Sequence, residues 1–195
     1  MSEITNEVKF HTKRKSARLE IIFGCMYSGK TSKLIREWEK RTSIGIKVLV
    51  INYIKDTRYG NDDYLYSHSN NKIPCVRIEK LCDVEIDRLE NVDTILINEG
   101  QFFDDLESSV RLWLEKYNKE IIVSGLDGDF KRKKFGQLLD IVPLADDVHK
   151  VKALCSICKD GTPALFTKRL SIEEEQLVIG GDDKYIPVCR FHYSN

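Results

Sequence analysis

Long apolar stretches are missing from this sequence. No run among its 195 residues approaches the roughly 20 apolar residues that cross a bilayer. The first residues are polar, without an apolar stretch of signal-peptide length. We therefore expect no membrane partner. No internal repeat or low-complexity segment is visible, and a chain of this length suits one ordinary domain with a small appendage.

Net charge is missing as well. The 31 lysines and arginines equal the 31 aspartates and glutamates, so the whole chain has no electrostatic attraction to nucleic acid or to an anionic membrane. The charge is uneven, however, because Lys9 to Arg18 reads "KFHTKRKSAR" and offers little to bury. We interpret residues 1–17 as a basic, disordered tail. The alternative is a localisation signal or a nucleic-acid patch.

Short apolar runs alternate with helical patterns through most of the chain, which is 42% apolar. The expected strands are Arg18 to Gly24, Lys47 to Asn52, Asp93 to Asn98 and Glu120 to Gly125; the expected helices are Lys30 to Ile44 and Asp104 to Asn118; a long polar loop covers Tyr53 to Lys72. This alternation predicts an α/β fold over residues 18–150, with a mostly parallel sheet flanked by helices. From about Val151 the pattern changes to short strands around cysteine pairs, which predicts a small domain over residues 151–195.

The stretch "GCMYSGKT", from Gly24 to Thr31, matches the phosphate-loop pattern G-x-x-x-x-G-K-[ST] between an expected strand and an expected helix. Backbone N–H groups in such a turn surround an anion at the positive end of the helix. Lys30 can then reach the terminal phosphates of a nucleotide, and the Thr31 hydroxyl can bind magnesium. The alternative is an ordinary strand-to-helix turn.

A second polar group follows the expected strand in "TILINEGQFF", which stops at Asn98 and Glu99. An ionised Glu99 could take a proton from an acceptor hydroxyl in line with a γ-phosphate. The alternative is a surface glutamate at a strand end. Asn98 stands where a carboxylate is expected for magnesium.

The six cysteines fall into two groups. Cys155-x-x-Cys158 and Cys189-x-x-His192 are two pairs about thirty residues apart, the sequence form of a tetrahedral structural zinc site. Four protein ligands leave no open position, so the metal is expected to be structural. Cys25, Cys75 and Cys82 have no motif around them, and we expect them to be small buried hydrophobic residues.

Seven stretches, taken together, point to a known family. They are "GCMYSGKT", "KDTRYG" (Lys55 to Gly60), "NEGQFF" (Asn98 to Phe103), "LDGDFKRKKFG" (Leu126 to Gly136), "TKRL" (Thr167 to Leu170), "VIGGDDKY" (Val178 to Tyr185) and "VCRFHY" (Val188 to Tyr193). In order and spacing they resemble the type II thymidine kinases, a phosphate-loop family with a zinc-held lasso. The resemblance runs from about Leu19 to Tyr193.

The resemblance implies a role for individual positions. The implied ATP-binding residues are Gly24, Cys25, Met26, Tyr27, Ser28, Gly29, Lys30, Thr31, Asp56, Thr57, Arg58, Asn98 and Gln101. The implied thymidine-binding residues are Met26, Phe102, Leu126, Phe130 and Phe135, with Gln176, Leu177, Val178, Ile179, Gly180 and Tyr185 in the lasso. Glu99 matches the family's catalytic base. Zinc would fix a lasso whose main chain discriminates among nucleobases, because unpaired polar edges on a wrong base are costly.

The activity implied by the resemblance is ATP-dependent phosphorylation of the 5′-hydroxyl of thymidine, and also of deoxyuridine. It further implies magnesium with ATP, a homotetramer, inhibition by thymidine triphosphate, and a cytosolic location. The sequence departs from the family pattern at Asn98, where Asp usually precedes the catalytic Glu, and at His192, where some members have Cys.

Two other interpretations stay open at this point. One is a zinc-containing, phosphate-loop ATP-binding protein whose zinc module and basic tail grip nucleic acid. Zero net charge and the pocket motifs argue against it. The other is a catalytically weakened kinase-like protein, because Asn98 replaces the expected Asp.

Overall fold

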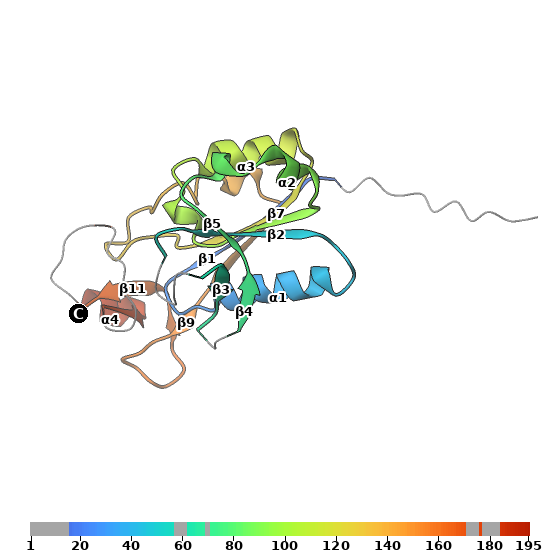
Figure 1. Ribbon diagram of the computed structural model, residues 1–195. Helices are drawn as coiled ribbons and strands as arrows, with labels where there is room; N and C mark the ends of the chain where they lie inside the picture. The colour runs from blue at the N-terminus through green and yellow to red at the C-terminus, as the bar shows by residue number, and fades with distance from the viewer. Residues whose placement is uncertain (1–15, 57–61, 69–70, 171–175, 177–183) are drawn as a thin grey trace, which may run out of the picture.

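The computed structural model describes residues 16–56, 62–68, 71–170, 176 and 184–195 (Figure 1). Most of the predicted basic tail therefore lies outside the described residues. The same holds for some predicted site residues, which are Thr57, Arg58, Leu177, Val178, Ile179 and Gly180.

A six-stranded sheet forms the centre of the molecule, and every strand pairing in it is parallel. Its strands, in spatial order, are β5 (Val76–Ile78), β2 (Val48–Tyr53), β6 (Thr94–Ile97), β7 (Glu120–Gly125), β1 (Arg18–Gly24) and β8 (Asp147–Val151). The four strands expected from the sequence are confirmed as β1, β2, β6 and β7. The predicted α/β class with a parallel sheet is confirmed as well.

Helices cover both faces of this sheet (Figure 1). Helix α1 (Lys30–Thr42) lies on one face, while α2 (Ile86–Glu90) and α3 (Leu106–Glu115) lie on the other. Short 3-10 turns span Leu81–Asp83, Gly100–Phe102 and Val142–Leu144. In the part of the chain that the structure describes, no helix is both long and apolar enough to cross a membrane.

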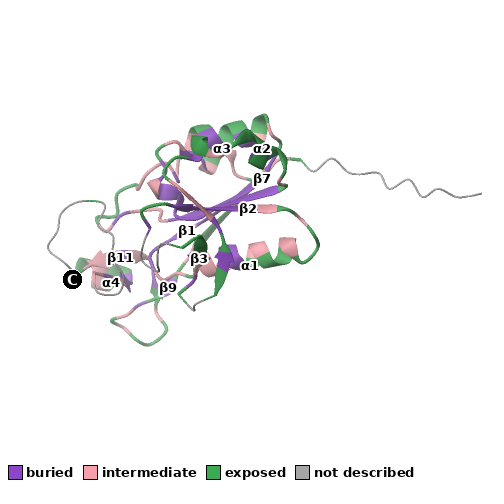
Figure 2. Cartoon of the chain, viewed as in Figure 1, coloured by how far each residue is buried: buried purple, intermediate pink, exposed green. Residues whose placement is uncertain are grey.

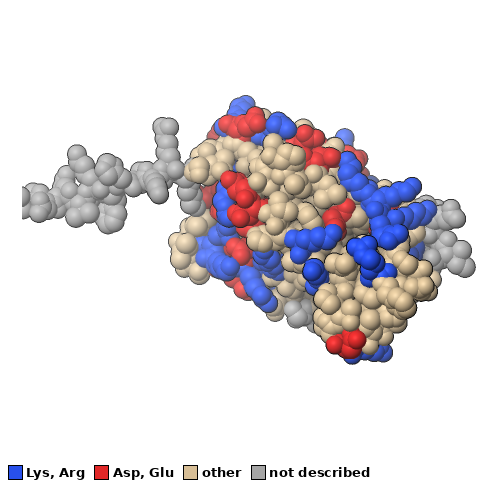
Figure 3. Space-filling model, turned by 180° about the vertical axis from the view of Figure 1, so that it is seen from behind, with Lys and Arg blue, Asp and Glu red and all other residues tan. Residues whose placement is uncertain are grey.

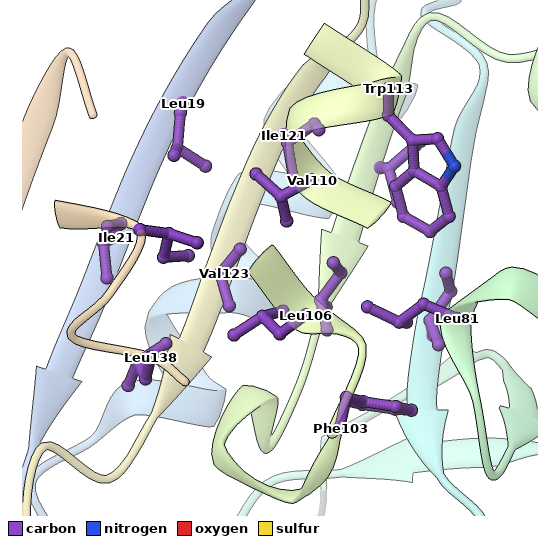
Figure 4. Close-up of a cluster of buried hydrophobic side chains, with 14 of the residues drawn as sticks. Leu19, Ile21, Leu81, Phe103, Leu106, Val110, Trp113, Ile121, Val123 and Leu138 are labelled. Atoms are coloured by element: carbon purple, nitrogen blue, oxygen red, sulfur yellow. The ribbon is translucent and has the colours of Figure 1, made fainter. Parts of the chain in front are cut away.

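The four inner strands, β2, β6, β7 and β1, are buried on both faces, which is why they read as continuous apolar runs, whereas the edge strands β5 and β8 are only partly buried (Figure 2). Successive side chains alternate between two clusters, because a strand points neighbours to opposite sides. Ile21 belongs to the cluster under α3, whereas Ile22 belongs to the cluster under α1. Figure 4 shows the first cluster, with Leu106 and Val110 of α3 close to Val123 of β7.

The chain after β8 forms short antiparallel ladders, as the change of pattern near Val151 predicts. The elements are β9 (Ala153–Leu154) paired with β10 (Pro163–Ala164), β11 (Phe166–Arg169) paired with β12 (Tyr185–Val188), and helix α4 (Arg190–Ser194). A domain boundary at this point stays a prediction.

Two expectations are wrong. The segment Tyr53 to Lys72 is not all loop, because β3 (Tyr64–Tyr66) pairs with β4 (Lys72–Pro74) and buries Leu65 in the cluster under α1. Three-residue strands are too short to give a clear alternation.

Cys82 is exposed, in a 3-10 turn against Asp105, whereas Cys25 and Cys75 are buried as expected.

Gly136 provides a test of how tightly the backbone packs beside the site. Its φ is +57°, and a Cβ there would lie 2.0 Å from the Gln101 carbonyl oxygen. Gly45 has a φ of +80° but nothing within 4 Å of a Cβ. We expect Gly45→Ala to cost about 1–2 kcal/mol of unfolding free energy, the strain of left-handed backbone.

Gly136→Ala adds overpacking, so we expect a total of roughly 2–5 kcal/mol. Urea denaturation of both variants checks this difference. Equal losses of unfolding free energy in the two variants would show that the close contact between Gly136 and the Gln101 backbone adds no cost to the substitution.

Candidate active site

A cavity of about 380 Å³ opens at the carboxyl ends of the parallel strands. It is lined by Met26, Tyr27, Ser28, Gly29, Lys30, Thr31, Ser32, Asp56, Tyr66, His68, Asn98, Glu99 and Leu126. Ligands in open α/β sheets bind in the crevice beyond the carboxyl ends of the strands. Most of the predicted ATP-binding residues within the described ranges meet here.

The phosphate loop connects β1 to α1 in the predicted position. Gly24 ends β1 so close to β8 that a Cβ would lie 2.2 Å from the Val151 carbonyl oxygen. Lys30 is buried, and its Nζ donates to the Cys25 carbonyl oxygen at 2.7 Å. The ammonium therefore lies across its own loop, and it carries three N–H donors in all. The first turn of α1 adds the positive end of the helix dipole.

Asn98 lies at the centre of a buried hydrogen-bond network. Its Oδ1 accepts from the Ser124 hydroxyl at 3.1 Å and from the Thr31 hydroxyl at 3.4 Å. Its Nδ2 donates to Asn52 Oδ1 at 3.0 Å. Thr31 and Asn98 thus present two oxygen atoms beside the phosphate loop, and oxygen is the ligand that magnesium prefers.

Glu99 follows β6 in an unusual backbone conformation, with φ 53° and ψ 43°. A non-glycine residue in this left-handed region costs about 1–3 kcal/mol and persists where the surroundings hold it. The side chain is buried, and its Oε2 accepts from Gln101 Nε2 at 2.6 Å. Gln101 Oε1 in turn accepts from the Leu126 N–H at 2.9 Å. This chain of contacts holds the carboxylate toward the cavity that Leu126 also lines.

The predicted nucleoside-binding side chains divide into two groups. Met26 and Leu126 line the cavity. Phe102 is outside the cavity lining and lies edge-on to Phe135, with ring centroids 5.5 Å apart and an interplanar angle of 80°. Phe130 packs beneath the Arg169 guanidinium, 3.7 Å from ring centroid to Cζ. Their contact with a nucleoside stays a prediction.

The predicted lasso is held at both its ends. Arg169, at the end of β11, donates to the Tyr185 hydroxyl at 2.7 Å and to the Gln176 carbonyl oxygen at 3.3 Å. Gln176 Nε2 donates to Asp129 Oδ2 at 2.8 Å. The predicted lasso residues that are described therefore contact one another through Arg169, or contact the segment after β7.

The four predicted metal ligands converge, with all ligand atoms within 4.8 Å of one another. The Sγ atoms of Cys158 and Cys189 are 3.8 Å apart, and His192 Nδ1 lies 3.3–3.7 Å from the three sulfurs. A tetrahedron with zinc–sulfur bonds of 2.3 Å has edges of roughly 3.8 Å. The donor set and its spacing therefore fit a four-coordinate metal ion.

The protonation of these thiols also suits a cation. Burial raises the pKa of the Cys155 thiol, but backbone N–H groups of Cys158, Cys189 and Ile157 outweigh it and lower the pKa to about 6. Burial and the neighbouring thiols raise the pKa of Cys158 to about 11. Neighbouring thiolates repel one another, so a metal ion between these thiols would favour the ionised form of all of them.

Sequence reasoning missed six residues of the site: Ser32, Asn52, Tyr66, His68, Ser124 and Thr167. Asn52 and Ser124 sit inside apolar strands, and the only signal was a buried polar residue near a strand's carboxyl end. Thr167 Oγ1 accepts from the Met26 N–H at 3.0 Å, across 141 positions of sequence. No local pattern reveals a contact over that separation.

Comparison with known proteins agrees with this geometry. The family model described as "Thymidine kinase" matches residues 17–193. The chain is 42% identical to "Thymidine kinase" of Oryza sativa subsp. japonica over 181 residues, 90% of this chain but 65% of that protein. It is 40% identical to "Thymidine kinase" of Sheeppox virus over 90% of this chain and 96% of that protein. It is 41% identical to "Thymidine kinase, cytosolic" of Homo sapiens, over 90% of this chain and 73% of that protein.

Proposed function

Because the chain belongs to the thymidine kinase family, we propose that it transfers the γ-phosphate of ATP to the 5′-hydroxyl of thymidine. The observation that carries this proposal is the cavity in which Lys30, Thr31, Asn98 and Glu99 meet. It joins a phosphate-binding turn to a buried carboxylate. That combination suits a phosphoryl transfer, in which catalysis is mostly positioning and charge stabilisation.

Each group has a role that follows from its position. The loop's backbone N–H groups and the Lys30 ammonium bind the phosphates. They also stabilise the negative charge that develops on the phosphates in the transition state. Glu99 accepts the proton of the 5′-hydroxyl, and Gln101 orients that carboxylate through its 2.6 Å hydrogen bond. Thr31 and Asn98 would hold magnesium, directly or through water. When bound, magnesium neutralises charge on the phosphates.

The nucleic-acid alternative finds no support in the comparisons, since the family model and the three relatives reported above are thymidine kinases by name. Figure 3 shows acidic and basic side chains on the same face, with broad uncharged areas between them. One assay separates the interpretations: ADP release with thymidine, with single-stranded DNA, and with neither. Thymidine-dependent release supports the kinase, and DNA-dependent release would overturn it.

The finer features of the proposal come from the family. We propose a structural zinc at Cys155, Cys158, Cys189 and His192, the use of deoxyuridine as well as thymidine, a homotetramer, and feedback inhibition by thymidine triphosphate. We also propose a kinase domain over residues 18–150 and a zinc-held lasso domain over 151–195. A cytosolic location is proposed from the printed names of relatives such as the human one.

Elemental analysis tests the metal. We expect one zinc per chain. Cys158→Ser should lose the zinc and raise the KM for thymidine, because the ligand set then has three members and the lasso is released. Cys82→Ser is the matched control, since Cys82 is exposed and outside the cluster. Full zinc content in Cys158→Ser would contradict the assignment.

Glu99→Gln tests the base. The amide keeps the shape of the side chain but cannot take a proton, so kcat should fall by roughly 10²–10⁴. Nucleotide binding should change little. Glu115→Gln, an exposed position on α3, serves as the control. A Glu99→Gln rate within a few-fold of the parent would show that another group accepts the proton.

Asn98→Asp tests the charge beside the metal. A carboxylate attracts a divalent cation more strongly than an amide oxygen does, so the magnesium concentration for half-maximal rate should fall. The gain should appear mainly in kcat, because the metal stabilises charge in the transition state. Superimposable magnesium titrations of parent and variant would refute the charge argument.

A further inference from the structure

The side chain of Asn98 raises a problem of orientation that a carboxylate does not. A carboxylate offers two equivalent oxygens, whereas an amide offers one oxygen and one NH2 group of nearly the same shape. Only the oxygen can face a cation. Asn98 is 2% exposed, so its NH2 group needs a hydrogen-bond acceptor inside the protein whenever the oxygen faces the cavity.

The two strands that flank β6 supply what the amide needs. Asn52, in β2, accepts from Asn98 Nδ2 at 3.0 Å. Ser124, in β7, donates to Asn98 Oδ1 at 3.1 Å. A hydroxyl can donate or accept, so Ser124 suits either orientation of the amide. Asn52 is therefore the contact that satisfies the NH2 group when the oxygen faces Thr31.

We propose that Asn52 is a positioning residue, which holds the Asn98 amide with its oxygen toward Thr31 and the nucleotide's divalent cation. The proposal rests on the proposed kinase function, and it adds a residue that lies outside the set of cavity-lining side chains. Asn52 is 3% exposed, so it acts through Asn98 and not by contact with nucleotide. Its importance depends on residue 98 being an amide.

This dependence gives a double-mutant test. Asn52→Leu keeps the branched shape but removes the acceptor, so an oxygen-inward Asn98 would bury an unsatisfied NH2 group. With Asn98 present, we expect ADP-dependent Mn²⁺ binding to weaken about tenfold, the usual size for losing a partner of a metal-site residue. In the Asn98→Asp background either oxygen can face the cation, so Asn52→Leu should change binding by less than about threefold.

The measurement is free Mn²⁺ by electron paramagnetic resonance, titrated with and without saturating ADP on the zinc-loaded chain. It reads binding without turnover. Asn52→Asp keeps an acceptor and should bind Mn²⁺ with ADP within about threefold of the parent, or more tightly. Thr94→Val is the control, because it removes a partly buried hydrogen bond to Glu120 at the opposite end of β6.

The outcomes are distinct. Weakening by Asn52→Leu in the parent background alone, with recovery in Asn52→Asp, supports the proposal. Equal weakening in the parent and Asn98→Asp backgrounds, or the same loss in Thr94→Val, would reduce Asn52 to a structural residue and overturn it. No loss in Asn52→Leu would overturn it as well. If the parent chain itself bound no Mn²⁺ with ADP, the kinase proposal would fail, and this one with it.

Discussion

The shared direction of β1, β6 and β7 is the constraint on which the site depends. Parallel pairing brings the carboxyl ends of these strands to one edge, where each strand delivers a different polar group. β1 delivers the phosphate loop, and β6 delivers Asn98 and Glu99. Ser124 follows Val123, the partner of Ile97, so it reaches Asn98 from the neighbouring strand. The register, more than any one side chain, assembles the chemistry.

Close backbone packing then fixes the carboxylate. Gly125 and Gly136 both lie against Gln101, where a Cβ would approach Gln101 oxygens to 2.4 Å and 2.0 Å. Gln101 is the partner of Glu99, whose own backbone is left-handed. Strain at Glu99 is therefore held by contacts that leave no room for a larger residue. This rigidity suits a group that must meet one hydroxyl in one geometry.

The sequence predicted the parts of the site that depend on local pattern, and it missed those that depend on distance. The phosphate loop, the strand before it and the helix after it follow from the order of residues from Arg18 to Thr42. The spacing of the two pairs Cys155/Cys158 and Cys189/His192 predicted a four-ligand metal site, and the four side chains do lie together in the structure. Asn52 could not be recognised, since its partner lies 46 positions away and both sit in strands that read as apolar. The β3–β4 hairpin was not predicted for another reason: strands of three residues are too short to show an alternating pattern of apolar residues.

The hydrogen bond from the Met26 N–H to Thr167 shows that the chain after β8 also contacts the turn between β1 and α1. Cys25 Sγ makes a second contact there, 3.5 Å from the Ala164 carbonyl oxygen, and both residues belong to the phosphate loop. A shortened chain ending near residue 151 would thus lose more than its metal ligands. It would uncover the buried thiol of Cys25 and leave a loop amide without its acceptor. The turn between β1 and α1 is thus completed by contacts from residues far along the chain, so the two proposed domains share hydrogen bonds at this turn.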